Sequence, residues 1–105
     1  MSDVLVEKRK APRYALILAA EVIDVARGTR VSGRTSDVSR LGCYIDTLNP
    51  VPRSSEIQLR ITRRGEVFEA TGRVAYVNPG CGMGVAFVAV PPEQQAILDA
   101  WLQNC

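Results

Sequence analysis

The segment EIQLRITRRGEVFEATGRVAYV, residues 56–77, carries the clearest structural pattern in the chain. Residues 56–62 alternate polar and apolar side chains without a break, which is typical of a β-strand with one buried face. Arg63-Arg64-Gly65-Glu66 has the composition of a hairpin turn, and residues 67–77 continue as a second long strand. Gly72 inside that strand indicates a β-bulge or the close approach of another backbone. The segment therefore predicts two adjacent antiparallel strands.

Four further strands are predicted around this hairpin. They cover residues 14–25, 30–36, 43–47 and 84–90. Gly42 opens the third of these strands in chain order, and Asn49-Pro50-Val51-Pro52 ends it because proline cannot join a central ladder. On propensity alone, residues 15–26 are also compatible with a helix. Six strands without intervening helices favour an all-β fold, a six-stranded antiparallel β-barrel or closed sheet.

The two ends of the chain differ from this strand pattern. Residues 1–13 combine alternating charge with Pro12, and we expect them to form a flexible N-terminal arm. Pro91-Pro92-Glu93 is typical of a helix start, so a helix is predicted at about residues 92–104. Its apolar stripe should pack on the barrel or plug one end, and consists of Ile97, Leu98, Trp101 and Leu102. A chain of 105 residues fits a single domain, here residues 14–105 after the arm.

Charge is distributed unevenly along the chain. Residues 1–64 hold 12 basic and 7 acidic side chains, whereas the remaining 41 residues hold 1 basic and 4 acidic ones. This asymmetry favours a cationic face and a small anionic partner over a nucleic acid, for which a broader basic surface is expected. Arginine supplies 11 of the 13 basic residues, which suits bidentate recognition but also follows from genomic base composition.

Metal-binding and catalytic patterns are missing from the sequence. It has no histidine, and its three cysteines, Cys43, Cys81 and Cys105, are widely spaced. We therefore expect no metal, no cofactor and no enzymatic activity. No apolar segment resembles a signal peptide, and the apolar run at residues 14–20 is too short to span a bilayer. A cytoplasmic location with reduced thiols is the expectation.

Arg9-Lys10-Ala11-Pro12-Arg13 forms an RxxxR motif on a segment that Pro12 stiffens. Two guanidinium groups on an extended segment suit phosphate oxygens or the O6 and N7 acceptors of guanine. Asp37-Val38-Ser39-Arg40-Leu41-Gly42 forms a DxSxxG motif, predicted in a loop between strands. Asp37 and Ser39 offer acceptors for the N1 and N2 donors of guanine, and Gly42 lets the backbone approach a ligand closely. Together the motifs suggest a receptor for a guanine nucleotide.

In this order, and with this strand pattern and a terminal helix, the two motifs resemble those of the PilZ domain, the bacterial receptor module for the second messenger cyclic di-GMP. The resemblance extends from Arg9 to the terminal helix and includes Gly72-Arg73-Val74-Ala75-Tyr76 and Gly84-Val85-Ala86-Phe87. It implies a receptor or adaptor whose arm closes over the ligand and passes the signal to an unidentified partner protein. Control of motility, pilus assembly or exopolysaccharide, and hence of biofilms, is what the family suggests.

The resemblance also implies a set of ligand-binding residues. All five positions that define the family's site match here: Arg9, Arg13, Asp37, Ser39 and Gly42. Lys8, Lys10 and Arg40 adjoin these motifs and are secondary candidates for ligand contact. A monomer or weak dimer is expected, and the number of ligands per chain stays open.

Other interpretations of the sequence remain. Tyr44 and Tyr76 lie on predicted strands with alternating faces, so packing in the core or on the surface is favoured over base stacking. The domain could act purely as a protein adaptor that binds no ligand. A small-barrel binder of single-stranded nucleic acid is a second alternative, although only six residues are aromatic and they are not clustered.

Overall fold

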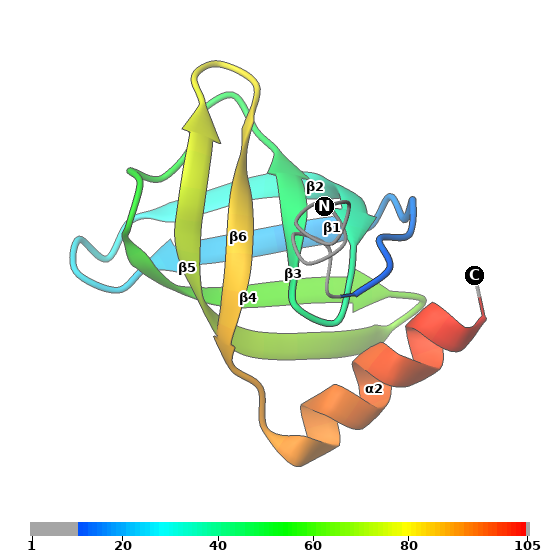
Figure 1. The fold of residues 1–105 in the computed structure, drawn as a ribbon. Coiled ribbons are helices and arrows are strands. Elements are labelled where there is room, and N and C mark those ends of the chain that lie inside the picture. Colours follow the sequence, from blue (N-terminus) through cyan, green and yellow to red (C-terminus); the bar gives the residue numbers. More distant parts are fainter. Residues whose placement is uncertain (1–10, 105) are drawn as a thin grey trace, which may run out of the picture.

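The strands close into a barrel in the computed structural model, which describes residues 11–104. The elements are β1 (Ala19–Asp24), β2 (Arg30–Val38), β3 (Gly42–Asp46), β4 (Glu56–Arg63), β5 (Glu66–Asn78), β6 (Gly82–Ala89) and α2 (Pro92–Gln103). The strands follow one another around the barrel in the order β1-β2-β3-β6-β5-β4, and β4 pairs with β1 to close it (Figure 1). All neighbouring strands are antiparallel, so the predicted all-β barrel with one terminal helix is confirmed.

The β4–β5 hairpin follows its sequence pattern closely. Ile57, Leu59 and Ile61 are buried while the polar residues between them are exposed. Arg63 pairs with Glu66, so only Arg64 and Gly65 form the turn, with φ angles of 51° and 83°. Positive φ at both central residues is the geometry that matches the twist of a two-residue hairpin, and glycine adopts it without strain.

β5 is long enough to pair with a different neighbouring strand along each part of its length. Its first part pairs with β4 and its second part with β6. The register with β6 shifts between Thr71 and Gly72, which agrees with the irregularity expected at Gly72, and shifts again between Val74 and Tyr76. A β-bulge bends a strand and redirects the side chains that follow it.

The first predicted strand was too long at its start. β1 begins at Ala19, and among residues 11–18 only Tyr14 makes a bridge, to Val38. The buried side chain of Thr35 explains the interruption. Its hydroxyl accepts a hydrogen bond from the Leu18 amide (3.0 Å) and donates one to the Leu16 carbonyl (2.7 Å), so a side chain replaces part of the ladder.

β2 extends further than predicted. It continues to Val38 instead of ending at Ser36, so Asp37 belongs to a strand and not to a loop. In the added part, Asp37 and Val38 pair with Tyr44 and Cys43 on β3. Val38 also forms the Tyr14 bridge, in which the amide of each residue donates to the carbonyl of the other at 2.9 Å. The turn that separates β2 from β3 is therefore reduced to residues 39–41. β6 likewise begins at Gly82, two residues before its predicted start.

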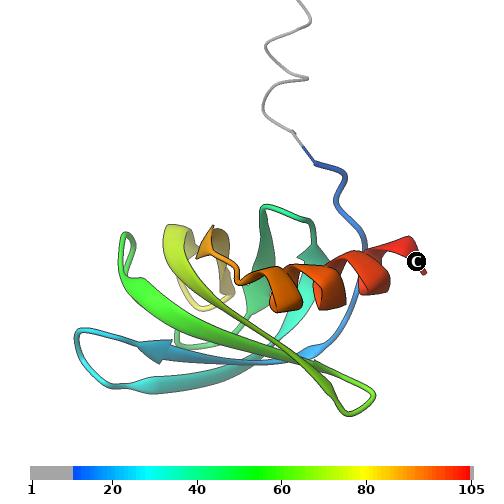
Figure 2. The ribbon, with the colours of Figure 1, turned by 90° about the horizontal axis from the view of Figure 1, so that it is seen from below.

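Helix α2 packs against β5 and lies across the barrel in the view from below (Figure 2). Its predicted apolar stripe faces the core: Leu98, Trp101 and Leu102 are buried, and Ile97 is half-buried against them. The Trp101 ring lies 6.3 Å from that of Phe68, and its Nε1–H donates to Glu66 Oε1 at 2.8 Å. Among residues 11–104 no helix has the length and apolar character needed to cross a membrane.

Candidate functional site

Arg13 and Asp37, 24 residues apart in the chain, meet on the outside of the barrel. The Tyr14–Val38 bridge places the segment before β1 alongside the end of β2. One terminal nitrogen of Arg13 then lies 2.8 Å from Asp37 Oδ2, and both side chains remain partly exposed. The hydrogen bond and the charge of Asp37 raise the pKa of Arg13, so the guanidinium stays cationic. The two motifs thus share one site through an ion pair between them.

Ser39 organises the turn between β2 and β3. Its hydroxyl accepts hydrogen bonds from the amides of Leu41 (3.1 Å) and Gly42 (3.2 Å). Its own amide donates to the Gly42 carbonyl at 2.8 Å, and the residue is 7% exposed. A serine that bonds the backbone two and three residues ahead fixes a tight turn. From the sequence we expected this hydroxyl to contact the ligand. In the structure it forms hydrogen bonds with the backbone of the turn.

Gly42 allows β3 and β6 to approach each other. A Cβ at this position would overlap the carbonyl oxygen of Val85 on β6. The missing side chain therefore allows strand pairing, a role that the sequence did not indicate. Glycine is required at this position because any larger residue would push β3 and β6 apart beneath the site.

A depression of about 200 Å³ lies beside the Arg13–Asp37 pair. Residues from the segment before β1, from the β2–β3 turn, and from β5 and β6 line it: Arg13, Asp37, Ser39, Leu41, Gly42, Cys43, Ala75, Tyr76, Gly84, Val85 and Ala86. Four of the five predicted site residues are thus together. The fifth, Arg9, lies outside the described residues, as do Lys8 and Lys10. Sequence reasoning missed the contribution of β5 and β6.

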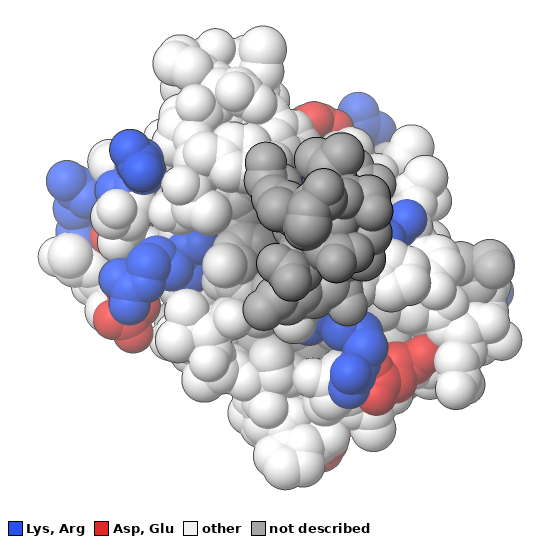
Figure 3. Space-filling view, in the orientation of Figure 1, with Lys and Arg blue, Asp and Glu red and all other residues white. Residues whose placement is uncertain are grey.

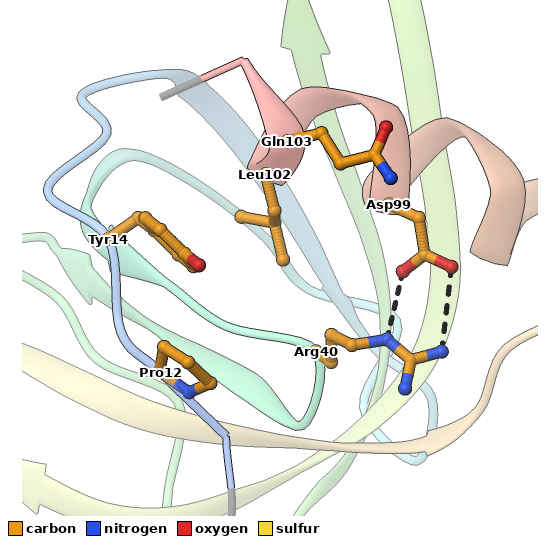
Figure 4. A pocket seen from close by; sticks show the side chains of 6 residues that line it. All are labelled: Pro12, Tyr14, Arg40, Asp99, Leu102 and Gln103. Atoms are coloured by element: carbon orange, nitrogen blue, oxygen red, sulfur yellow. Dashed lines mark hydrogen bonds and ion pairs between the residues drawn. The ribbon is translucent and has the colours of Figure 1, made fainter.

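Arg40 is directed away from this depression. Its Nε lies 2.9 Å from Asp99 Oδ1 on α2, and the side-chain amide of Gln95 donates to the same oxygen at 2.9 Å. The hydrogen bond from Arg40, and to a smaller extent the one from Gln95, holds the pKa of Asp99 below its ordinary value. Arg40 lines a separate cavity of about 290 Å³, which is shown in Figure 4 together with its other lining residues, Pro12, Tyr14, Asp99, Leu102 and Gln103. In the structure, Arg40, a secondary candidate for ligand contact, is thus paired with Asp99.

Cys43 lies beneath the site and is buried. Burial is the main cause that raises the pKa of its thiol far above the ordinary range, and the negative charge of Asp37 adds to the effect. It therefore stays protonated at neutral pH and is a poor nucleophile. In the part of the chain that the structure describes, no three His, Cys, Asp or Glu residues lie together as a metal site would require.

Charged side chains lie in small separate groups on one face of the barrel (Figure 3). On the face shown in Figure 3, and outside the area that the grey atoms cover, blue side chains form separate patches, some of them next to red ones. The visible, described part of this face therefore shows no continuous basic stripe of the kind that binds the backbone of a nucleic acid (Figure 3).

The fold and the site together define a small closed barrel with an arginine-acidic depression on its outer face. The sequence profile of the PilZ domain matches residues 7–104, so the chain belongs to the PilZ domain family. No curated protein sequence matches the chain.

Solved PilZ structures share the fold. The PilZ domain of CeSA from a cellulose-synthesizing bacterium superposes with a TM-score of 0.67 at 18% identity, over 83% of this chain and 91% of that one. The PilZ domain of Escherichia coli YcgR with c-di-GMP gives 0.70 at 15% identity, over 88% and 86%. The longer E. coli YcgR in complex with c-di-GMP gives 0.77 at 13% identity, over 92% of this chain but 45% of that one.

Proposed function

We propose that this chain is a receptor for cyclic di-GMP that changes the conformation of its N-terminal arm on binding and so signals to a partner protein. The observation that carries the proposal is the Arg13–Asp37 pair, which brings both PilZ motifs to one open depression. Structures of YcgR with c-di-GMP, and the fold shared with the Bacillus subtilis inhibitor of motility MotI, support it. Action in the cytoplasm, on motility or biofilm formation, is part of the same proposal.

The chemistry of the pair suits a guanine nucleotide. Arg13 presents a planar fork of donors that matches phosphate oxygens or guanine O6 and N7. A carboxylate has about four acceptor positions, so Asp37 keeps free capacity for guanine N1–H and N2–H while it holds Arg13. Asp37 therefore orients the guanidinium before the ligand arrives, which lowers the entropy lost on binding.

The arm supplies the proposed conformational signal. Arg9 lies four residues before Arg13, and in this proposal it closes over a ligand that Arg13 and Asp37 already hold. The bound arm would then present a new surface to a partner protein. The output is a change of shape, and it requires no chemical turnover.

Isothermal titration of the full chain tests the receptor function. We expect saturable binding of cyclic di-GMP that weakens as salt is added, because the contacts join opposite charges. Cyclic di-AMP should bind more weakly, because adenine carries a donor where guanine has the O6 acceptor and lacks the N1 and N2 donors. If cyclic di-GMP does not bind, the receptor function is wrong and the remaining interpretation is a protein adaptor that binds no ligand. Tight binding of a single-stranded oligonucleotide that cyclic di-GMP does not displace would instead favour a nucleic-acid binder.

A further inference from the structure

A β-bulge at Ser36 turns Asp37 toward the outside of the barrel. Thr35 is fully buried, so in an unbroken β-strand Asp37, two residues later, would face the core as well. The register with β3 instead shifts between these two residues, which pair with Ile45 and Tyr44 respectively. Ser36 is the additional residue, and after it the Asp37 side chain is 27% exposed. Asp37 therefore reaches the site because β2 is irregular directly after Thr35.

The Thr35 hydroxyl fixes the segment that connects Arg13 to β1. It accepts a hydrogen bond from the Leu18 amide at 3.0 Å and donates one to the Leu16 carbonyl at 2.7 Å. The Thr35 amide adds a third hydrogen bond, to the Leu18 carbonyl at 2.8 Å. Two of these three contacts come from the hydroxyl. A side chain of the same shape without a hydroxyl would leave a partly buried amide and a partly buried carbonyl without that partner.

The segment before β1 is thus attached to β2 at two points, one on each side of Asp37. One point is Thr35, and the other is the Tyr14–Val38 bridge, whose two hydrogen bonds are both 2.9 Å long. Arg13 directly precedes the bridge and lies 2.8 Å from the Asp37 carboxylate. Both side chains of this ion pair are partly exposed, and such a pair is too weak to hold the segment in place by itself. The backbone attachment therefore keeps Arg13 beside its partner.

We propose that Thr35 is a positioning residue of the ligand site, because its hydroxyl holds Arg13 beside Asp37 before cyclic di-GMP arrives. Thr35 does not line the depression and belongs to neither motif, so it acts through the backbone of the segment before β1. When that segment is attached in only a fraction of the molecules, the apparent affinity falls by the same fraction. The inference rests on the proposed cyclic di-GMP function and deepens it.

Isothermal titration with cyclic di-GMP tests the inference in three variants. Thr35→Val keeps the shape of the side chain but removes both hydroxyl contacts, and we expect affinity to fall about 3- to 10-fold. Thr35→Ser keeps the hydroxyl and should bind within about 2-fold of the unchanged protein. Ile61→Val is a matched change of a buried residue on β4, and it should leave affinity unchanged although it lowers the melting temperature.

A double-mutant cycle separates positioning from a general loss of stability. If Thr35 acts through Arg13, Thr35→Val has nothing further to misplace in a chain that already carries Arg13→Ala. In that background it should change affinity by less than about 2-fold. An equal loss in both backgrounds would show that the hydroxyl acts on the barrel as a whole, and the inference would be overturned.

Hydrogen exchange of the unchanged protein without ligand supplies a readout that needs no variant to fold. The Leu18 amide, which the hydroxyl holds, should be protected as strongly as the Thr35 amide. Rapid exchange of the Leu18 amide that slows only on addition of cyclic di-GMP would mean that the ligand itself orders the segment, and the inference would be wrong. If the unchanged protein binds and Thr35→Val binds equally well, Thr35 positions nothing and the receptor function stands. If the unchanged protein does not bind, both proposals fail.

Discussion

Replacing Arg13 by alanine is expected to weaken cyclic di-GMP binding about 10- to 100-fold while leaving the fold intact. A charge-assisted hydrogen bond to a ligand contributes about 1.5–3 kcal/mol, which corresponds to that range. The Arg13 side chain is 41% exposed, and its ion pair with Asp37 is of the surface type that contributes about 0–1 kcal/mol to folding. Isothermal titration gives the affinity, and thermal unfolding checks the fold.

Two companion variants make the Arg13 result specific. Arg34→Ala removes the same charge from an exposed position on β2 that does not line the depression, and it should bind nearly as well as the unchanged protein. Arg13→Lys keeps the charge but loses the planar fork, so we expect an intermediate affinity. Equal losses in Arg13→Ala and Arg34→Ala would mean that Arg13 acts only through net charge.

Replacing Trp101 by alanine is expected to lower the free energy of unfolding by about 3–5 kcal/mol. Trp101 is 2% exposed and packs against Phe68, and its indole N–H donates to Glu66 on β5. The change therefore removes a large buried ring and leaves a carboxylate without that donor. Since a domain of this size is stable by about 5–15 kcal/mol, much of the stability is at stake.

Urea unfolding followed by circular dichroism measures this effect. Trp101→Phe keeps an aromatic ring and should lose less stability than Trp101→Ala. Gln103→Ala, at an exposed position of the same helix, should change stability by less than about 0.5 kcal/mol. A loss below about 1 kcal/mol in Trp101→Ala would contradict the view that α2 is part of the core.

The fold was predictable where local pattern and tertiary structure agree. Alternation at residues 56–62 and the glycine after Arg64 correspond directly to β4 and its hairpin turn. The start of β1 was not predictable in this way, because the hydroxyl of Thr35 interrupts the ladder from 17 and 19 residues away in the chain. A contact between distant residues leaves no periodic trace in the sequence.

The site was predictable in its motif residues and not in its surroundings. The family resemblance named Asp37 and Arg13, and the bridge at Tyr14 brings them together. The outward turn of Tyr76 depends on a bulge at Ala75, a residue that carries no bulge signal of its own. The exact function of Gly42 also depended on tertiary structure, because Val85 on β6 occupies the space next to it.

The central claim is that the depression beside Arg13 and Asp37 binds cyclic di-GMP. Its most direct test is to titrate the isotope-labelled chain with cyclic di-GMP and to map the changes in backbone amide chemical shifts. We expect the largest changes at residues 37, 39, 41–43, 75–76 and 84–86, which line the depression. Changes centred instead on residues 32–34 and 46–48, which line a different cavity, would contradict the claim, as would a spectrum that does not change at all.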